Sequence, residues 1–588
     1  MFNARLYRAA LIPAVIAFVV MMFSFEPIPH ALQEPVATPE FAGTASARLA
    51  RQIALRADDR TPGSEGDRTI AAQVRDAFES IEGGRVSVQN FSGDFRGEDV
   101  EMQNVILTIP GASERTVLVI APRDSDRHLG AASSASATAE LISLARALGT
   151  QRHERTIMLV STDGSAEGAL GARELIDSLP RSDDIEVAIA LSQSGVADPE
   201  PPFVLPWGTG PESADAQLLQ TARQVASRSF GERDSNPGTW AGLSRLAFPA
   251  GLSEAAALRG EGVEAIGLSA HGERLVPPED DTTVSSETMQ RAGTAALDLI
   301  LTLDQAERGA PSGGPDDYVR LGGNLIPGWS IALLALTLLL PPLLTAMEAW
   351  GREQRQNWRT RRTIPWALER ALLPLAALLL AYALSIVGLI PDPPFPFDPA
   401  AYPPGVKGPI VLVLLIAAVV LAALLVRPMR TPLDSQPHAL AAASGLVTGG
   451  ALVVLWFLNP YLTLLLFPAA NVWLLPARAA GPPRAFVVAA FAVASLLGAL
   501  AAATTVAVQL DLGPAAPWHL LLMVADGQVG LGTSLVWCVL LGGLIAAVSA
   551  TAADRRGVEP LGGSLRGAGT HIGPGALGAT PPAEARLR

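Results

Sequence analysis

The sequence contains very little cysteine, lysine and charge. A single cysteine, Cys538, excludes an intramolecular disulfide bond and any metal site built from several cysteines. The only lysine is Lys407, so residues 39–314 cannot hold a phosphate-binding P-loop, a motif that requires a lysine. The 56 acidic residues outnumber the 43 basic residues, for a net charge of −13, which argues against binding to duplex nucleic acid.

Apolar residues are abundant and gather in long stretches. Only 17% of the 588 residues are charged and 49% are hydrophobic, which excludes a disordered or coiled-coil chain. The stretch 9–25 follows Arg5 and Arg8 without a clear cleavage site, so residues 1–38 are expected to form an uncleaved signal anchor. A crossing helix needs roughly 20 apolar residues. Residues 325–556 are therefore expected to form seven further spans, near 327–347, 367–390, 409–426, 438–457, 461–476, 485–509 and 530–552.

Arginine follows an alternating pattern along these expected spans. Arginines occur in every second connection, at 352–362, 427–430, 478–484 and 555–556, and are almost missing from the connections between them. The positive-inside rule then places residues 39–314 outside the cytoplasm. The tail 557–588, rich in glycine and proline, is expected to be disordered and cytoplasmic. The preference for arginine, alanine, glycine and proline is typical of a GC-rich bacterial genome. We therefore expect a multi-pass protein of a bacterial cell membrane.

The expected spans carry almost no charged residue. Ion channels, pumps and many transporters keep ionisable side chains or interrupted helices at membrane depth, because such groups are costly there and persist only for use. Transport is therefore a weaker hypothesis, although a transporter or lipid-handling protein with an accessory outer domain stays an alternative. Seven spans also exceed what anchoring needs, so partner helices in the membrane are expected.

Residues 39–314 have the composition of a globular domain in which helices and strands alternate. Strands are predicted at 86–91, 105–109, 116–120, 156–161 and 187–191. Helices are predicted at 45–56, 68–81, 135–148, 167–178, 215–227 and 286–303. This order indicates an α/β fold with a mostly parallel sheet that is covered by helices on both faces. In such a sheet, ligands bind at the carboxyl ends of the strands.

Five short stretches carry a family resemblance. They are Arg60-Thr-Pro-Gly-Ser64, Asn104-Val-Ile106 leading to Pro110-Gly111, the run from Val117 to Asp124, the run from Gly130 to Ala139, and the run from Asp163 to Gly171. In this order they resemble the co-catalytic zinc aminopeptidases of peptidase family M28, over about residues 45–303. The resemblance implies a three-layer α/β/α fold of the phosphorylase/hydrolase type. It also implies two zinc ions that activate a water molecule and polarise the scissile carbonyl group.

The resemblance further implies where the zinc ligands would stand, and this sequence lacks most of them. Pro122 takes the place of a ligand histidine, two residues before Asp124, which matches the aspartate that orients that histidine. Ser133 takes the place of the aspartate that bridges both ions. Ser165 and Ala166 take the places of the general-base glutamate and a ligand glutamate. Proline and alanine have no donor atom, and a neutral hydroxyl cannot hold two dications together.

Two positions complete the comparison with the family. Ser192 takes the place of a further ligand aspartate, and only His271 matches a ligand, although the Asp-Thr pair that should follow it closely comes ten residues later at Asp281. The other ionisable groups nearby are expected to be ordinary solvated loop charges or helix-terminus residues rather than a rebuilt metal centre. This set comprises Asp124, Asp126, His128, Asp163, Glu167 and His271.

The lost ligands favour a pseudo-peptidase over an enzyme. We expect a membrane-anchored domain that holds no cofactor and binds a peptide, a protein or an envelope component without cleaving it. The layout resembles the endoplasmic reticulum metallopeptidase, which keeps its zinc ligands, and the attachment subunit of the glycosylphosphatidylinositol transamidase, whose similar domain is non-catalytic. Because the ligands are missing here, the sequence is more similar in this respect to the transamidase subunit. The alternative is an active zinc exopeptidase with atypical ligands.

Overall fold

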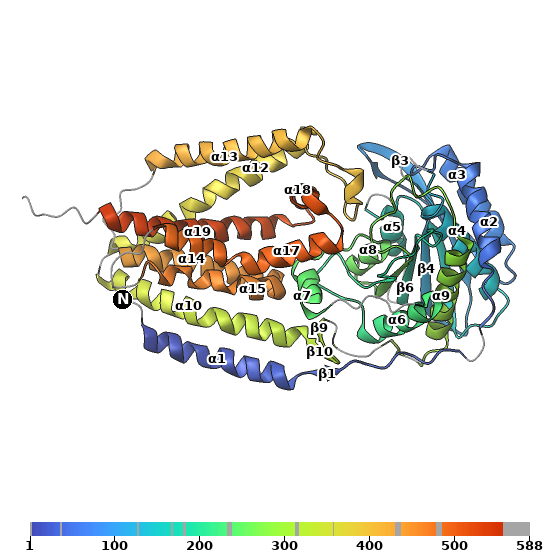
Figure 1. The fold of residues 1–588 in the computed structure, drawn as a ribbon, viewed down its shortest axis with the longest axis horizontal. Helices are drawn as coiled ribbons and strands as arrows, with labels where there is room; N and C mark the ends of the chain where they lie inside the picture. The colour runs from blue at the N-terminus through green and yellow to red at the C-terminus, as the bar shows by residue number, and fades with distance from the viewer. Residues whose placement is uncertain are drawn as a thin grey trace, which may run out of the picture.

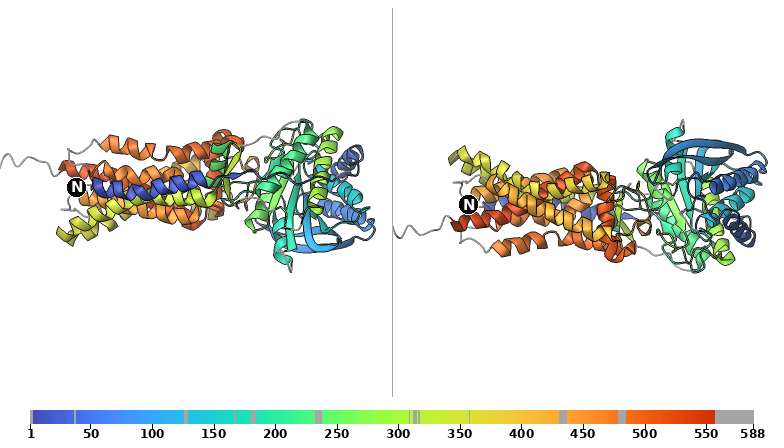
Figure 2. Two further views of the ribbon diagram at one scale, coloured as in Figure 1. Left: turned by 90° about the horizontal axis from the view of Figure 1, so that it is seen from below. Right: turned by 90° about the horizontal axis from the view of Figure 1, so that it is seen from above.

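The computed structural model has an α/β domain at one end and a region of apolar helices at the other (Figure 1). Figure 2 shows the same two parts from two further sides, with the helices running roughly along the long axis of the molecule. The structure describes residues 3–35, 38–125, 129–165, 168–179, 184–231, 238–307, 309–311, 315, 317–356, 358–429, 437–477 and 485–556. The predicted cytoplasmic tail, 557–588, lies outside the described residues.

A seven-stranded sheet forms the centre of the α/β domain. In sheet order its strands are β2 (Arg85–Phe95), β3 (Glu98–Ile109), β5 (Arg155–Thr162), β4 (Ser113–Pro122), β6 (Ile185–Ser192), β8 (Ala265–Ser269) and β7 (Val204–Leu205). The four strands from β5 to β8 are parallel, whereas β2, β3 and β7 pair antiparallel with their neighbours. The predicted parallel arrangement therefore holds only in the centre. At one edge β2 and β3 form a hairpin whose turn residues, Arg96 and Gly97, both have positive φ, as a tight turn of this kind requires.

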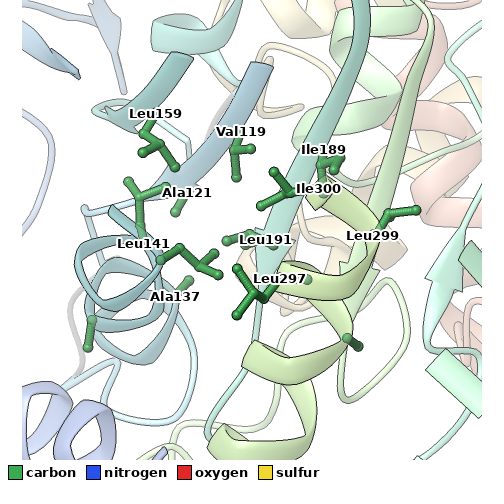
Figure 3. Close-up of a cluster of buried hydrophobic side chains, with 14 of the residues drawn as sticks. Val119, Ala121, Ala137, Leu141, Leu159, Ile189, Leu191, Leu297, Leu299 and Ile300 are labelled. Carbon is green, nitrogen blue, oxygen red and sulfur yellow. The ribbon is translucent and has the colours of Figure 1, made fainter. Parts of the chain in front are cut away.

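Helices cover both faces of this sheet, because successive strand residues alternate between the faces. Val117, Val119 and Ala121 of β4 pack into one core, and Leu118 and Ile120 pack into another. The first core is covered by α2 (Gly43–Arg56), α3 (Glu65–Glu79), α4 (Ser134–Leu148), α6 (Ala216–Phe230) and α9 (Ser286–Asp304). Figure 3 shows Ala137 and Leu141 of α4 and Leu297 and Ile300 of α9 gathered beside the strand residues Val119, Ala121 and Leu191. The second core is covered by α5 (Leu170–Ser178) and α8 (Glu254–Gly260). The predicted α/β/α fold is confirmed.

Six helices among the described residues are long and apolar enough to cross a membrane. They are Ala4–Phe23 (α1), Gly328–Gln356 (α10), Thr360–Ile386, Lys407–Leu425, His438–Leu458 and Leu531–Thr551. A seventh is added if α16 (Ala485–Ala494) and α17 (Leu497–Gln509), bent by 40°, form one broken span. One predicted span remains, 461–476, and it consists of α15 (Pro460–Leu466) and a 3₁₀ helix, Phe467–Leu474. Together these are shorter than the roughly 20 residues that a straight crossing needs.

The α/β domain contacts the helical region at several places, among them a small sheet and helix α7. A small sheet of β1 (Glu26–Pro27), β10 (Asn324–Pro327) and β9 (Tyr318–Leu321) ties the end of α1 to the start of α10. Helix α7 (Thr239–Ala247) packs against α15 and α17, and the Asn459 side chain donates hydrogen bonds to the Leu246 and Ala247 carbonyl groups. The domain therefore stands directly on the end of the helical region (Figure 1).

Candidate functional site

The carboxyl ends of the central strands open on a cavity of about 100 Å³ that faces the helical region. Most of the positions where the family would place its zinc ligands line this cavity. Pro122 ends β4, Ser192 ends β6, Ser133 precedes α4, and Asp124 and Ser165 follow β4 and β5. Their arrangement follows from the parallel centre of the sheet, because parallel strands bring their carboxyl ends to one edge. Ala166 lies outside the described residues.

Asp124 and Ser165 are bonded to each other across the cavity wall. Asp124 is only 2% exposed, and its Oδ1 accepts hydrogen bonds from the Ser165 amide (3.0 Å) and hydroxyl (2.6 Å). Both bonds fall on one carboxylate oxygen and fix the Asp124 side chain against the segment that follows β5. The position of the family's general base is thus occupied by a hydroxyl that donates to Asp124.

Ser133, at the position of the bridging aspartate, is engaged by a buried carboxylate. Asp281 Oδ1 accepts hydrogen bonds from the Ala132 amide (2.7 Å) and the Ser133 amide (2.9 Å), and Oδ2 accepts from the Ser133 hydroxyl (2.5 Å). Asp281 is fully buried and lies in the loop before α9. Sequence analysis noted Asp281 only for its distance from His271. Its role in closing the start of α4 depends on a contact between segments almost 150 residues apart.

Replacing Asp281 by alanine is expected to lower the free energy of unfolding of the α/β domain by about 2 kcal/mol. The change leaves the buried Ala132 and Ser133 amides without their acceptor. Asp281→Asn keeps one carbonyl oxygen for the two amides and is expected to cost less. Pulse proteolysis of the full-length protein in detergent, over a urea series, measures both variants. Equal, small losses in the two variants would contradict this account of the loop.

Arg123, between Pro122 and Asp124, points into a buried ion cluster. Its Nε and Nη2 donate to the two carboxylate oxygens of Asp67, at 2.8 and 2.9 Å, and Nη2 lies 3.3 Å from Asp163 Oδ2. All three side chains are completely buried. Burial and the neighbouring Asp67 charge raise the pKa of Asp163. The expectation of a solvated or helix-terminus Asp163 is therefore wrong, and α5 begins only at Leu170.

Glu254 is a cavity residue that sequence analysis missed. It begins α8, its Oε1 accepts a hydrogen bond from the Thr162 hydroxyl (2.8 Å), and its Oε2 has no hydrogen-bond partner among the described residues. Burial raises the pKa of Glu254 to about 8, and the Asp124 charge adds to this effect. The carboxyl group is therefore largely protonated at neutral pH. The only local signal was Ser253, a serine of the kind that caps helices, one residue before Glu254. This signal is weak because α8 has only seven residues.

His271, the last possible zinc ligand, does not line this cavity. Its backbone forms a bridge with Glu200, and its Nδ1 is buried without a hydrogen-bond partner among the described residues. His271 follows Ser269 of β8, which pairs with Ser192 at the end of β6, so it lies at the same edge of the sheet although it is not among the residues that line the cavity. Asp126, His128 and Glu167 lie outside the described residues.

The side chains around the cavity do not fit a pair of zinc ions. Within the part of the chain that the structure describes, no group of three or more His, Cys, Asp or Glu is placed to hold a metal ion. Among the cavity carboxylates, Asp124 accepts from Ser165, Glu273 accepts from Arg245 (2.6 Å) and from the Leu252 amide (3.2 Å), and the raised pKa of Glu254 favours its neutral form. Zinc prefers several histidine, cysteine or free carboxylate donors, and the serines offer only neutral hydroxyls.

The α/β domain is similar to one protein family and to several solved structures. Residues 104–299 match the family model of Peptidase family M28. Among solved structures, a zinc aminopeptidase from Bacillus subtilis is 14% identical over 47% of this chain and 98% of its own, with a TM-score of 0.39. A glutaminyl cyclase from an Acidobacteriales bacterium is 20% identical over 47% of this chain and 99% of its own, with a TM-score of 0.38. No curated protein sequence matches the chain.

Proposed function

The chain carries a peptidase family M28 domain over residues 104–299, and we propose that this domain binds a peptide or protein partner outside the cytoplasm without cleaving it. The whole protein would then be a membrane-anchored pseudo-peptidase. One observation carries the proposal: the cavity at the carboxyl ends of the strands is lined by Pro122, Ser133, Ser165 and Ser192 where a zinc peptidase needs metal ligands and a base.

The setting of the cavity supports binding rather than hydrolysis. The fold has kept a concave site at the strand ends, which is where α/β proteins bind ligands. The polar groups around this site donate to or accept from one another, as Ser133 does with Asp281 and Ser165 does with Asp124. Such pairs stabilise the walls of a site, but they leave no activated nucleophile there.

The helical region supports attachment to a membrane. Six or seven described helices have the length and composition of spans, and α1 packs beside α10. The alternating arginines support a position of the α/β domain outside the cytoplasm. In a bacterium, the partner would be an envelope component or a second membrane protein.

Metal content and cleavage together test this proposal. Full-length protein, purified in detergent and dialysed against buffer with excess zinc and then without zinc, is expected to keep well below one zinc ion per chain by mass spectrometry. It is also expected to release no chelator-sensitive product from aminoacyl nitroanilides.

Two bound zinc ions together with chelator-sensitive cleavage would overturn the proposal and support an exopeptidase with atypical ligands. The double variant Asp124→Asn Glu254→Gln is the matched control. If zinc binds to the unchanged protein and not to this variant, the metal lies in the cavity.

A further inference from the structure

A loop of the helical region closes the mouth of the cavity. Helices α12 (Leu372–Ile386) and α13 (Lys407–Met429) are joined by this loop, which lies against the α/β domain in Figure 1. Pro396, Phe397 and Asp398 from the loop line the cavity opposite residues of the α/β domain. The cavity wall is thus built from two distant parts of the chain.

The α/β domain holds the loop through its main chain. The Gly168 amide donates to the Pro396 carbonyl oxygen (2.9 Å), and Arg173 Nη2 donates to the Phe395 carbonyl oxygen (2.8 Å). A Cβ atom on Gly168 would lie 2.9 Å from the Pro394 side chain, and Gly168 has a φ of +71°. The domain therefore offers a glycine surface and donor groups to two consecutive carbonyl groups of this segment, as peptide-binding sites do.

A charged contact follows these main-chain bonds. Arg274 Nε lies 3.7 Å from Asp398 Oδ1, and Arg274 Nη1 also donates to the Asp511 carbonyl oxygen (2.7 Å). The described groups of the α/β domain that bond or pair with this segment are thus donors: one amide and two guanidinium groups. They suit carbonyl groups and one acidic side chain of a bound segment.

The aromatic residues of the loop face the helical region. Phe395 and Phe397 are 2% and 1% exposed and pack in an apolar cluster with α12 and the segment around His519. Along the loop, the carbonyl groups are held by the domain while the aromatic rings are held by the helices. Any displacement of the segment would therefore be transmitted to α12 and α13. Of all the described spans, Lys407–Leu425 in α13 has the smallest buried share.

We propose that Pro394–Asp398 is an internal peptide ligand of the M28-type cavity, and that the external partner is a proline-containing peptide with an acidic residue that displaces it. This inference rests on the proposed peptide-binding function and adds the chemistry and the regulation of the site. With the segment in place the cavity measures about 100 Å³. Ligand pockets usually exceed roughly 300 Å³, so a peptide needs the segment to leave.

The test measures binding of a fluorescent peptide with the sequence of residues 392–398, Asp-Pro-Pro-Phe-Pro-Phe-Asp, to full-length protein in detergent. Asp398→Arg places like charges beside each other and weakens the internal segment, so the peptide is expected to bind on the order of tenfold more tightly than to the unchanged protein. The double variant Asp398→Arg Arg274→Glu restores an opposite-charge pair, and it is expected to lose that gain.

Two controls accompany this measurement. Asp99→Arg makes the same charge change on the exposed hairpin of β2 and β3 and is expected to bind the peptide as the unchanged protein does. A peptide whose last residue is lysine is expected to bind Asp398→Arg protein on the order of tenfold more weakly, because it meets Arg274 with the wrong charge.

Hydrogen exchange of residues 392–404 reports release of the segment independently of the peptide. Exchange is expected to be faster in Asp398→Arg, and in Gly168→Ala, whose added methyl group meets Pro394. If exchange accelerates and the peptide still fails to bind, the inference is overturned. It is equally overturned if neither variant accelerates exchange, because the segment is then a fixed wall. Cleavage of the bound peptide would instead refute the non-catalytic function and leave the displacement intact.

Discussion

Replacing Arg123 by methionine lowers the free energy of unfolding of the α/β domain by about 3–5 kcal/mol. The substitution removes the guanidinium group that contacts both Asp67 and Asp163, and all three side chains are fully buried. The two carboxylates then face each other in a medium of low polarity. Breaking a buried ion pair by removing one member is far more costly than the pair's own net contribution, because a charge stays buried and uncompensated.

An exposed arginine provides the matched control for this substitution. Arg75 on α3 is 48% exposed, and its Nε lies 3.8 Å from Glu79 in an i,i+4 pair. Arg75→Met is expected to cost no more than about 0.5 kcal/mol. Pulse proteolysis of the full-length protein over a urea series measures both variants. A loss below about 1 kcal/mol for Arg123→Met would show that the cluster does not depend on its cation.

The stability of the α/β domain is expected to decrease as the pH rises from 5 to 9. Burial raises the pKa of Glu254 to about 8 and that of Glu140 in α4 to about 7, from an ordinary value near 4.5. The folded state therefore binds these protons more tightly than the unfolded state does. The resulting stabilisation is complete below pH 4.5 and is lost as the pH passes through the two raised values. We expect a loss on the order of 2 kcal/mol or more.

The glutamine variants test the source of this pH dependence. Glu254→Gln and Glu140→Gln keep the shape of the protonated carboxyl groups but do not titrate, so each is expected to flatten the curve. The polar groups that face them are Thr162 and Asp124 around Glu254, and Ser194 beside Glu140. Thermal unfolding of the full-length protein at half-unit pH steps measures the effect. An unchanged slope in both variants would assign the dependence to other groups.

Much of the α/β domain was predictable because its signals are local. The predicted strand 116–120 corresponds to β4 (Ser113–Pro122) and the predicted helix 135–148 to α4 (Ser134–Leu148). A run of buried β-branched residues and a run of small residues at helical spacing each indicate one element without any distant partner. The short elements α8 and β8 were missed, because seven and five residues give too little periodicity and packing defines them instead.

In the candidate site, too, residues in local motifs were predictable, whereas residues that depend on distant contacts were not. Alignment of local motifs was enough to locate Pro122, Ser133 and Ser192, which the structure places around one cavity. It could not locate Glu254 or Asp281, which belong to segments far away in the sequence. Glu254 stands in no motif, and Asp281 was noted only as part of a displaced Asp-Thr pair; each acquires its role from burial beside another element.

By itself, the amino-acid sequence predicted long apolar segments, an α/β domain that resembles peptidase family M28, and proline, serine or alanine at most of the positions where that resemblance implies zinc ligands. These properties depend on side-chain chemistry and on short-range periodicity. Only the tertiary structure decided that Asp398 and its neighbours enter the cavity, that Glu254 is buried beside Asp124, and that Arg123 joins two carboxylates. Those features depend on which distant segments meet, because desolvation and charge pairing arise only where the folded chain brings groups together and removes water.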